Sequence, residues 1–118
     1  MFYIGTDIVD IARIRDNLKH SEIKFLNRIF TKNEIDYCNS KTDPAIHFAG
    51  RFAAKEAVKK ALLSSRIISK ISMKEIDIIS KKNIPQVEIS SLSICDIKVS
   101  ISHVDSFAVA TAILIDNK

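Results

Sequence analysis

A long helix between residues 44 and 63 constrains the fold more than any other feature of this sequence. Asp43-Pro44 is a helix-start signal, because proline suits the first helical position and aspartate suits the cap. Only Gly50 interrupts the segment that follows. Along one face, small side chains recur at every fourth position: Ala45, Ala49, Ala53, Ala57 and Ala61. Residues four apart share a helical face, so this strip permits close approach to a sheet, with Phe48 and Phe52 as bulky anchors beside it.

The remaining segments supply the sheet and two shorter helical regions. Apolar and β-branched runs predict strands at residues 2–9, 76–80, 86–90, 97–104 and 107–115, with a turn at 104–107 joining the last two. Helical spacing begins at Ile11 and breaks near His20-Ser21, and Thr31 with Glu34 forms a capping box that opens a short helix. We therefore expect an α+β fold, a long helix packed on a mostly antiparallel sheet. Without repeats or linkers, residues 1–118 are predicted to form a single domain.

Composition narrows the classes of function. The formal net charge is +4, and most of the surplus lies in residues 10–32, with six basic side chains against three acidic ones. A surplus of this size favours acidic partners only weakly. The aromatic residues fall mostly at core-like positions, which argues against a nucleic-acid-binding module. Cys38 and Cys95 lack metal-binding spacing. The N-terminus is unlike a signal peptide and no apolar run is long enough to cross a membrane, so we expect a cytoplasmic protein.

Three polar residues stand in unusual surroundings, and each also has an ordinary structural interpretation. Asp7 lies in an apolar strand, where a carboxylate is costly to bury, but it can also face solvent or cap the next helix. Glu56 lies beside the alanine strip, yet it is four residues from Lys60 and can form a common surface ion pair. His103 ends a strand and can bond to the backbone there. The other histidines, His20 and His47, are predicted to be surface residues.

Four segments connect these residues. They read GTDIVDI from Gly5, FTKNE from Phe30, RFAAKEA from Arg51 and VSISH from Val99. In this order and spacing they resemble the holo-acyl-carrier-protein synthase family, and the resemblance extends from Ile4 to the C-terminus. It implies the 4′-phosphopantetheinyl transferase-like fold.

The resemblance also implies an activity and a set of residues. The family transfers 4′-phosphopantetheine from coenzyme A to a serine of apo-acyl carrier protein, which releases adenosine 3′,5′-bisphosphate and supports fatty acid biosynthesis. Its divalent metal, usually Mg²⁺, is held by an Asp and a Glu at the positions of Asp7 and Glu56. Lys60 and His103 would contact the phosphates, and Arg51 would bind coenzyme A. As general base we favour Glu56, acting directly or through water, with Asp7 acting through water as the alternative.

Partners follow from the same resemblance. Acyl carrier proteins are acidic, and Arg13 occupies the family position implicated in docking them. Lys24 and Arg28 are further candidates on charge and helical spacing alone. The family commonly forms homotrimers with active sites shared between subunits. Arg51 and His103 would then serve a site that the neighbouring subunit completes with its own metal ligands.

The sequence departs from the family in two loops. Leu63-Ser64-Ser65 replaces a Gly-Thr-Gly turn, which leaves the loop beyond Lys60 undefined, and Asn83-Ile84-Pro85 replaces Gly-Lys-Pro, which removes one lysine contact to the cofactor. Asn83 can stand in for glycine, because asparagine tolerates left-handed backbone angles. Two other functions remain open: a catalytically degenerate scaffold of the same fold, and a metal-dependent nuclease or phosphatase that uses the same two carboxylates.

Overall fold

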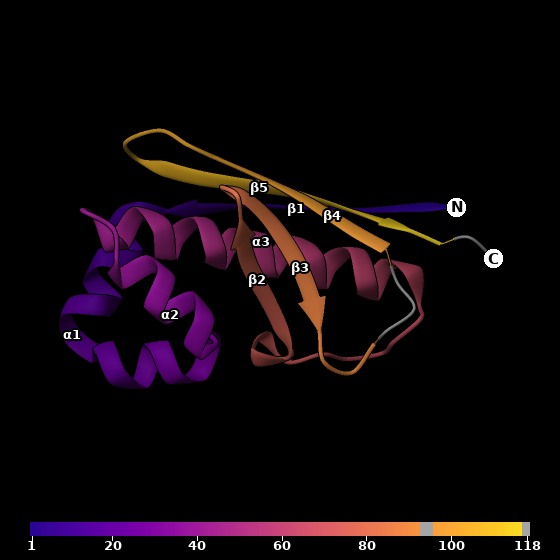
Figure 1. Ribbon diagram of the computed structural model, residues 1–118, viewed down its shortest axis with the longest axis horizontal. Coiled ribbons are helices and arrows are strands. Elements are labelled where there is room, and N and C mark those ends of the chain that lie inside the picture. The colour runs from indigo at the N-terminus through magenta and orange to yellow at the C-terminus, as the bar shows by residue number, and fades with distance from the viewer. Residues whose placement is uncertain (93–95, 117–118) are drawn as a thin grey trace.

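The long helix α3 packs against a sheet and also contacts the two shorter helices. The computed structural model describes residues 1–92 and 96–116. The elements follow in the order β1 (Phe2–Asp10), α1 (Ile11–Ile29), α2 (Lys32–Asn39), α3 (Pro44–Ser65), a short 3₁₀ helix η1 (Met73–Glu75), β2 (Ile76–Lys81), β3 (Ile84–Ile89), β4 (Asp96–His103) and β5 (Phe107–Ile115). In Figure 1, α3 runs along the sheet formed by β1, β5 and β4, while α1 and α2 gather near one end.

The strands confirm the antiparallel prediction but divide into two sheets. β1, β5 and β4 form one antiparallel sheet in that order, so the N-terminal strand pairs with the C-terminal one. β2 and β3 form a separate hairpin. The predicted turn at 104–107 is confirmed by a hydrogen bond from the Val104 amide to the Phe107 carbonyl, 2.9 Å long. The strand order was not predictable, because it depends on pairing between β1 and β5, which lie at opposite ends of the chain.

Small side chains bring the sheet and α3 together, as the alanine strip predicts. Ala108, Ala110 and Ala112 of β5 are buried, and so are Ala53, Ala57 and Ala61 of α3. The closest approach is at Gly5 of β1, where an added Cβ would lie 1.8 Å from the Ala57 carbonyl oxygen. No other residue fits there, so Gly5 sets the distance between β1 and the helix.

The local signals in the helical region are largely confirmed. Ser21 has non-helical angles (φ −151°, ψ 40°) within α1, which is the expected break near His20-Ser21. The Thr31–Glu34 capping box is present, with both of its hydrogen bonds formed. Asn83 has φ 64°, as expected for its turn, and Lys82 before it has φ 51°. At the other altered loop, α3 continues to Ser65 and ends at Arg66 in a left-handed conformation with φ 63°, a cap position where glycine is favoured.

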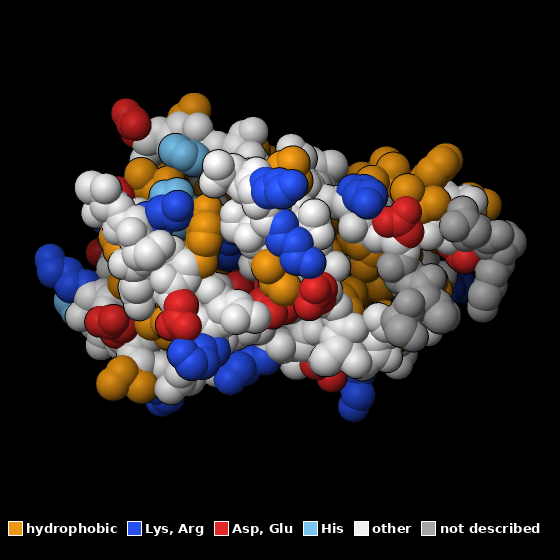
Figure 2. Space-filling view, in the orientation of Figure 1, with side chains coloured by type: hydrophobic (Ala, Val, Ile, Leu, Met, Phe, Trp, Pro, Cys, Tyr) orange, Lys and Arg blue, Asp and Glu red, His pale blue; other side chains and the backbone are white. Residues whose placement is uncertain are grey.

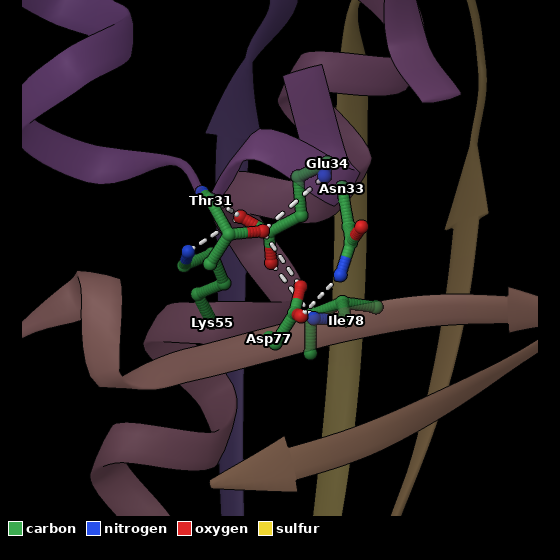
Figure 3. A network of polar contacts seen from close by, with 6 residues as sticks. All are labelled: Thr31, Asn33, Glu34, Lys55, Asp77 and Ile78. Carbon is green, nitrogen blue, oxygen red and sulfur yellow. Dashed lines mark hydrogen bonds and ion pairs between the residues drawn. The ribbon is translucent and has the colours of Figure 1, made fainter. Parts of the chain in front are cut away.

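A buried ion pair joins the helical region to the hairpin (Figure 3). The Lys55 ammonium donates to Glu34 Oε1, and both side chains are fully buried. Glu34 Oε1 also accepts from the Thr31 amide, and Glu34 Oε2 accepts from the Ile78 amide at 2.7 Å. Asp77 of β2 adds bonds to the Thr31 hydroxyl and the Asn33 amide group. The pair thus connects α2, α3 and β2 at one point.

The outer face of the three-stranded sheet carries exposed apolar side chains. Ile4 and Ile8 of β1 are each 65% exposed, and Phe2 is 63% exposed; Val109 of β5 adds to this face. Because side chains alternate along a strand, these residues lie opposite the face that packs on α3. Among the described residues, no helix combines the length and the apolar character needed to span a bilayer.

Candidate active site

Asp7 reaches the helix because of its place on β1. It follows Gly5 by two residues, so both lie on the strand face that packs against α3. The close approach at Gly5 brings the strand to the turn of α3 that contains Ala57 and Ala61. The Asp7 side chain is 17% exposed. It is neither the solvent-facing carboxylate nor the helix cap that were the alternatives, because Asp10 caps α1 by accepting from the Ala12 amide.

Lys60 contacts Asp7. Its ammonium donates to the Thr6 carbonyl oxygen at 2.9 Å and to Asp7 Oδ1 at 3.3 Å, and half of the side chain remains exposed. Lys60 therefore points to β1 rather than along its own helix. The surface ion pair between Glu56 and Lys60, which was the structural alternative for Glu56, is absent from the described part of the chain.

Glu56 and Asp7 line the same cavity, which has a volume of about 660 Å³. Glu56 forms no hydrogen bond or ion pair with any residue that the structure describes. The apolar part of the wall comes from β1, α1, α3 and β5 and includes Phe25, Phe52 and Phe107. Asp7 and Glu56, from different elements, thus share one partly apolar cavity with the helix cap Asp10, and Glu56 has no partner among the described residues.

The cationic side of the cavity comes from α1. Arg13 and Arg28 line it, and neither forms an ion pair with a described residue. Arg15, between them in sequence, is instead bound to Asp43 by two hydrogen bonds of 2.8 and 2.7 Å. Lys24, the third candidate for docking, is exposed but does not line the cavity. The structure therefore brings Arg13 and Arg28 together with the two carboxylates and leaves Lys24 outside.

The carboxylates suit a hard divalent cation. Mg²⁺ prefers oxygen ligands and is commonly held by one or two carboxylates, with water and substrate phosphate completing its shell. Asp7 and Glu56 are such a donor set, since one is free and the other is held only by the long Lys60 contact. In the described ranges, 1–92 and 96–116, there is no group of three or more His, Cys, Asp or Glu side chains that could hold a metal ion. The residues present thus fit an ion that retains water and do not fit a closed structural site.

Arg51 and His103 lie in a different cluster, and neither lines this cavity. Arg51 is buried, with 7% of its surface exposed, and its guanidinium carbon lies 4.1 Å from the centre of the Tyr37 ring. Lys41 lies over the same ring, 4.6 Å from its centre. His47 packs edge-to-face on Tyr37, with ring centres 6.0 Å apart. We call Tyr37, Lys41, His47, Arg51 and His103 the Tyr37 cluster.

Electrostatic interactions connect the histidines of the Tyr37 cluster. Burial lowers the pKa of His47, and the positive charges of Lys41, Arg51 and His103 lower it further, while Asp43 opposes them. In Figure 2, histidine side chains lie beside a Lys or Arg side chain at the upper left of this face. His47 is therefore half-buried among cations, which corrects its prediction as an ordinary surface residue. His20 is exposed, as predicted.

Cys38 does not take part in this chemistry. It is fully buried, and burial raises the pKa of its thiol to about 12. Such a thiol is inert near neutral pH. Cys95 lies outside the described residues.

Sequence reasoning overlooked Tyr37, Lys41 and His47. The spacing of His47 and Arg51, four residues apart on one helix, was an available signal. Tyr37 and Lys41 lie in α2 and the turn after it, and no pattern in the sequence connects them to α3.

Residues 3–112 match the family described as the 4′-phosphopantetheinyl transferase superfamily. The chain is 44% identical to the holo-[acyl-carrier-protein] synthase of Chlamydia pneumoniae, over 96% of each protein. It is 47% identical to the enzyme of the same name from Chlamydia muridarum, over 96% of this chain and 94% of that protein.

Solved structures agree with the sequence relatives. The holo-(acyl-carrier-protein) synthase of Bacillus anthracis, in complex with CoA (3′,5′-ADP), superposes with a TM-score of 0.80 at 34% identity and covers 95% of this chain and 94% of that one. The Helicobacter pylori holo-[acyl-carrier-protein] synthase in complex with coenzyme A gives 0.82 at 36% identity, over 95% and 99%. By these likenesses, and by the fold and carboxylate arrangement described above, the chain belongs to the 4′-phosphopantetheinyl transferase superfamily and, within it, to the holo-[acyl-carrier-protein] synthases.

Proposed function

We propose that this protein transfers 4′-phosphopantetheine from coenzyme A to a serine of an apo-acyl carrier protein and releases adenosine 3′,5′-bisphosphate. The observation that carries the proposal is the cavity lined by Asp7, Glu56, Arg13 and Arg28. Family membership supports it, since the relatives are holo-[acyl-carrier-protein] synthases and two similar structures contain coenzyme A or its nucleotide part. The proposed enzyme acts as one transferase domain in the cytoplasm, where the holo-carrier serves fatty acid biosynthesis.

The transfer requires a proton acceptor close to the carrier serine. The serine Oγ attacks the phosphorus that bears pantetheine, a new P–O bond forms, and the bond to adenosine 3′,5′-bisphosphate breaks. We assign the serine proton to Glu56, because its carboxylate is free of hydrogen bonds within the described chain. Asp7 acting through water is the competing assignment, although its carboxylate already accepts a hydrogen bond from Lys60.

Asp7 and Glu56 would also hold Mg²⁺. When bound, the ion would neutralise charge on the pyrophosphate and stabilise the departing phosphate. Lys60 adds a positive charge beside Asp7, with half of its side chain exposed for contact with phosphate oxygens. Positioning and charge neutralisation are the main requirements of phosphoryl transfer, and these three residues supply both.

The acidic carrier protein docks at the basic side of the cavity. Arg13 and Arg28 are available for acidic side chains, because neither forms an ion pair with a described residue. Lys24 is exposed on the same helix and extends this surface. The serine-bearing segment of the carrier would then enter between α1 and the carboxylates.

We further propose a homotrimer in which neighbouring subunits share the active sites. The exposed row of Phe2, Ile4 and Ile8 supports association through the outer face of the sheet, since large exposed apolar patches mark interaction surfaces. The separation of Arg51 and His103 from the cavity also supports it. In a trimer these two residues would bind the coenzyme A that lies in the cavity of the neighbouring subunit.

The decisive experiment incubates the protein with apo-acyl carrier protein, coenzyme A and Mg²⁺ and weighs the carrier by intact mass spectrometry. We expect a gain of one phosphopantetheine group, abolished by EDTA and restored by added Mg²⁺. Glu56→Gln should abolish the gain, whereas Glu88→Gln, on the exposed side of β3, should leave it unchanged.

Two results would redirect the assignment. No gain with wild-type protein, under conditions in which a known synthase loads the same carrier, would support the degenerate scaffold. Hydrolysis of a phosphodiester without any need for a carrier would support the nuclease or phosphatase alternative.

A further inference from the structure

β1 continues directly into α1 without a connecting loop. The strand ends at Asp10 and the helix begins at Ile11 (Figure 1). Asp10 still has extended backbone angles, with φ −76° and ψ 115°. Asp7 near the end of the strand and Arg13 in the first turn of the helix line the same cavity. The position of the Arg13 backbone relative to Asp7 therefore depends on how this junction is held.

Three contacts hold the junction between β1 and α1. Asp10 pairs with Phe107 at the end of the β1–β5 register. The Ile11 amide donates to the Ser106 carbonyl oxygen at 2.9 Å, and the Ala12 amide donates to Asp10 Oδ1 at 3.0 Å. The first two contacts use the backbone and survive a change of side chain. The third depends on the side chain of Asp10, so a substitution there can remove it selectively.

Arg13 lies in the helical turn that this cap completes. The first amides of a helix have no acceptor within the helix, and two of them at this end are satisfied by Ser106 and Asp10. Arg13 is exposed and forms no ion pair with a described residue. No salt bridge therefore fixes its guanidinium within the described chain, and its location at the cavity depends on the backbone of the first turn.

The charge of Asp10 does not favour the proposed carrier. Asp10 is exposed, lines the cavity and forms no ion pair with any residue that the structure describes. A negative charge at the entry site of an acidic protein opposes its association. Aspartate is, however, among the residues preferred at a helix N-cap. The capping hydrogen bond thus accounts for the aspartate, and the charge does not.

We propose that Asp10 is a positioning residue for carrier docking and that it acts through Arg13. Its cap holds the first turn of α1 in the position from which the Arg13 guanidinium meets the carrier, beside Asp7 and Glu56. This role rests on the function proposed above, because Arg13 is proposed there to bind the carrier. Without the cap the first turn frays, and docking must restore its order, which weakens carrier binding.

The test compares variants of equal charge that differ in their ability to cap a helix. Asp10→Asn and Asp10→Ser remove the carboxylate but keep a side-chain oxygen suited to the cap, whereas Asp10→Ala removes both. In carrier loading followed by intact mass spectrometry, the carrier KM of Asp10→Ala should be about fivefold above that of the other two variants. Asp10→Asn and Asp10→Ser should have a carrier KM no higher than wild type, because a repulsive charge is gone. The kcat and the KM for coenzyme A should be equal in all four proteins.

Ile78→Val separates positioning from a general loss of stability. Ile78 is buried in β2 and does not line the cavity. Loss of one buried methyl group should destabilise the fold to a similar extent as loss of the cap, and thermal unfolding verifies the match. The carrier KM of Ile78→Val should equal that of wild type. Amide hydrogen exchange in the first two turns of α1 should be faster in Asp10→Ala than in Asp10→Asn.

Two results would overturn this role for Asp10. Equal carrier KM values in Asp10→Ala, Asp10→Asn and Asp10→Ser would show that the cap does not contribute to docking. A fall of kcat in all three would show that the carboxylate acts through its charge. Either result, obtained with a wild-type protein that loads the carrier, leaves the proposed function intact. A wild-type protein that neither binds nor loads the carrier would contradict the proposed function and this role together.

Discussion

Two carboxylate–lysine contacts in this protein differ in how completely the carboxylate is satisfied. Glu34 is fully buried with Lys55, and its two oxygens accept from that lysine and from two backbone amides. Asp7 has one long contact to Lys60, whose side chain is half-exposed, and Glu56 beside it has no partner in the described chain. The sequence does not separate the two kinds of site, since Lys55, which binds Glu34, is adjacent to Glu56, which lines the cavity with Asp7.

The two kinds of carboxylate have different roles in the molecule. A buried carboxylate whose oxygens all accept hydrogen bonds from protein donors has a structural role. Removing any of those donors leaves an uncompensated charge in the low-dielectric interior and destabilises the fold. A carboxylate in a cavity with unfilled lone pairs has capacity for a ligand. We assign Glu34 to the first class and both Asp7 and Glu56 to the second.

The largest effect on stability should follow from breaking the buried pair. Lys55→Met leaves the Glu34 carboxylate buried without its cation, which should cost about 3–5 kcal/mol of unfolding free energy. Urea denaturation at pH 7 measures it. A loss of unfolding free energy below about 1 kcal/mol would show that water reaches the Glu34–Lys55 pair in solution.

The same variant should acquire a characteristic pH dependence. Burial already raises the pKa of the Glu34 carboxyl, and loss of Lys55 raises it further. A group with a raised folded-state pKa contributes its full stability below the unfolded pKa and loses it as the pH rises through the folded one. The stability that Lys55→Met loses relative to wild type should thus be smaller at pH 5 than at pH 8. In the double variant with Glu34→Gln, this difference between the two pH values should disappear.

The next effect should appear in activity and not in stability. Glu56→Gln should lower the rate of carrier loading at least about 100-fold, because the site loses a ligand and a proton acceptor. Its unfolding free energy should stay within about 0.5 kcal/mol of wild type, since no described partner is lost. A destabilisation comparable to that of Lys55→Met would show that Glu56, like Glu34, is held by protein donors and has a structural role.

The basic rim should give a smaller effect that depends on salt. Arg28→Glu, at the cavity, should raise the KM for the carrier about tenfold at low ionic strength, and less at high salt. Lys24→Glu, outside the cavity, should have a weaker effect. Lys32→Glu serves as the matched control, because Lys32 is already paired with Asp36. If all three charge reversals raise the KM equally, the net charge of the protein, and not the position of Arg28 at the cavity, determines carrier binding.

The smallest effect concerns an ion pair at the surface. The Arg15 guanidinium lowers the pKa of the Asp43 carboxyl by hydrogen bonding. A lowered folded-state pKa contributes stability above the unfolded pKa, about 3.9, and loses it as the pH falls through the folded value. Asp43→Asn should therefore reduce stability slightly at pH 7 and not at all in strong acid, as thermal unfolding across pH can show. An undiminished effect in strong acid would contradict the ion pair.

Local signals were predictable, and contacts between elements were not. The capping box at Thr31, the break at Ser21 and the left-handed Asn83 follow from residues within a few positions of one another, and all three are confirmed. The alanine strip predicted close packing on a sheet because a helical repeat fixes which side chains share a face. The resemblance to the family identified Asp7 and Glu56, and the structure brings them to one cavity.

The sequence predicted least well which charged residues pair with one another. Sequence spacing favoured a bond between Glu56 and Lys60, but Lys60 binds β1, because the strand passes within reach of its ammonium. The burial of Lys55 depends on Glu34, 21 positions away, and its role was invisible in the motif that contains it. His47 was predicted to be a surface residue because, apart from Arg51 on the same helix, its neighbours Tyr37, Lys41 and His103 come from other segments.

Direct metal binding tests the central claim that Asp7 and Glu56 form the open, functional pair. Mn²⁺ prefers the same oxygen ligands as Mg²⁺ and can be titrated into the protein with coenzyme A present, while electron paramagnetic resonance counts the free ion. We predict one bound ion per active site in wild type and in Glu88→Gln, and loss of binding in both Asp7→Asn and Glu56→Gln. Unchanged Mn²⁺ binding in those two variants would contradict the account.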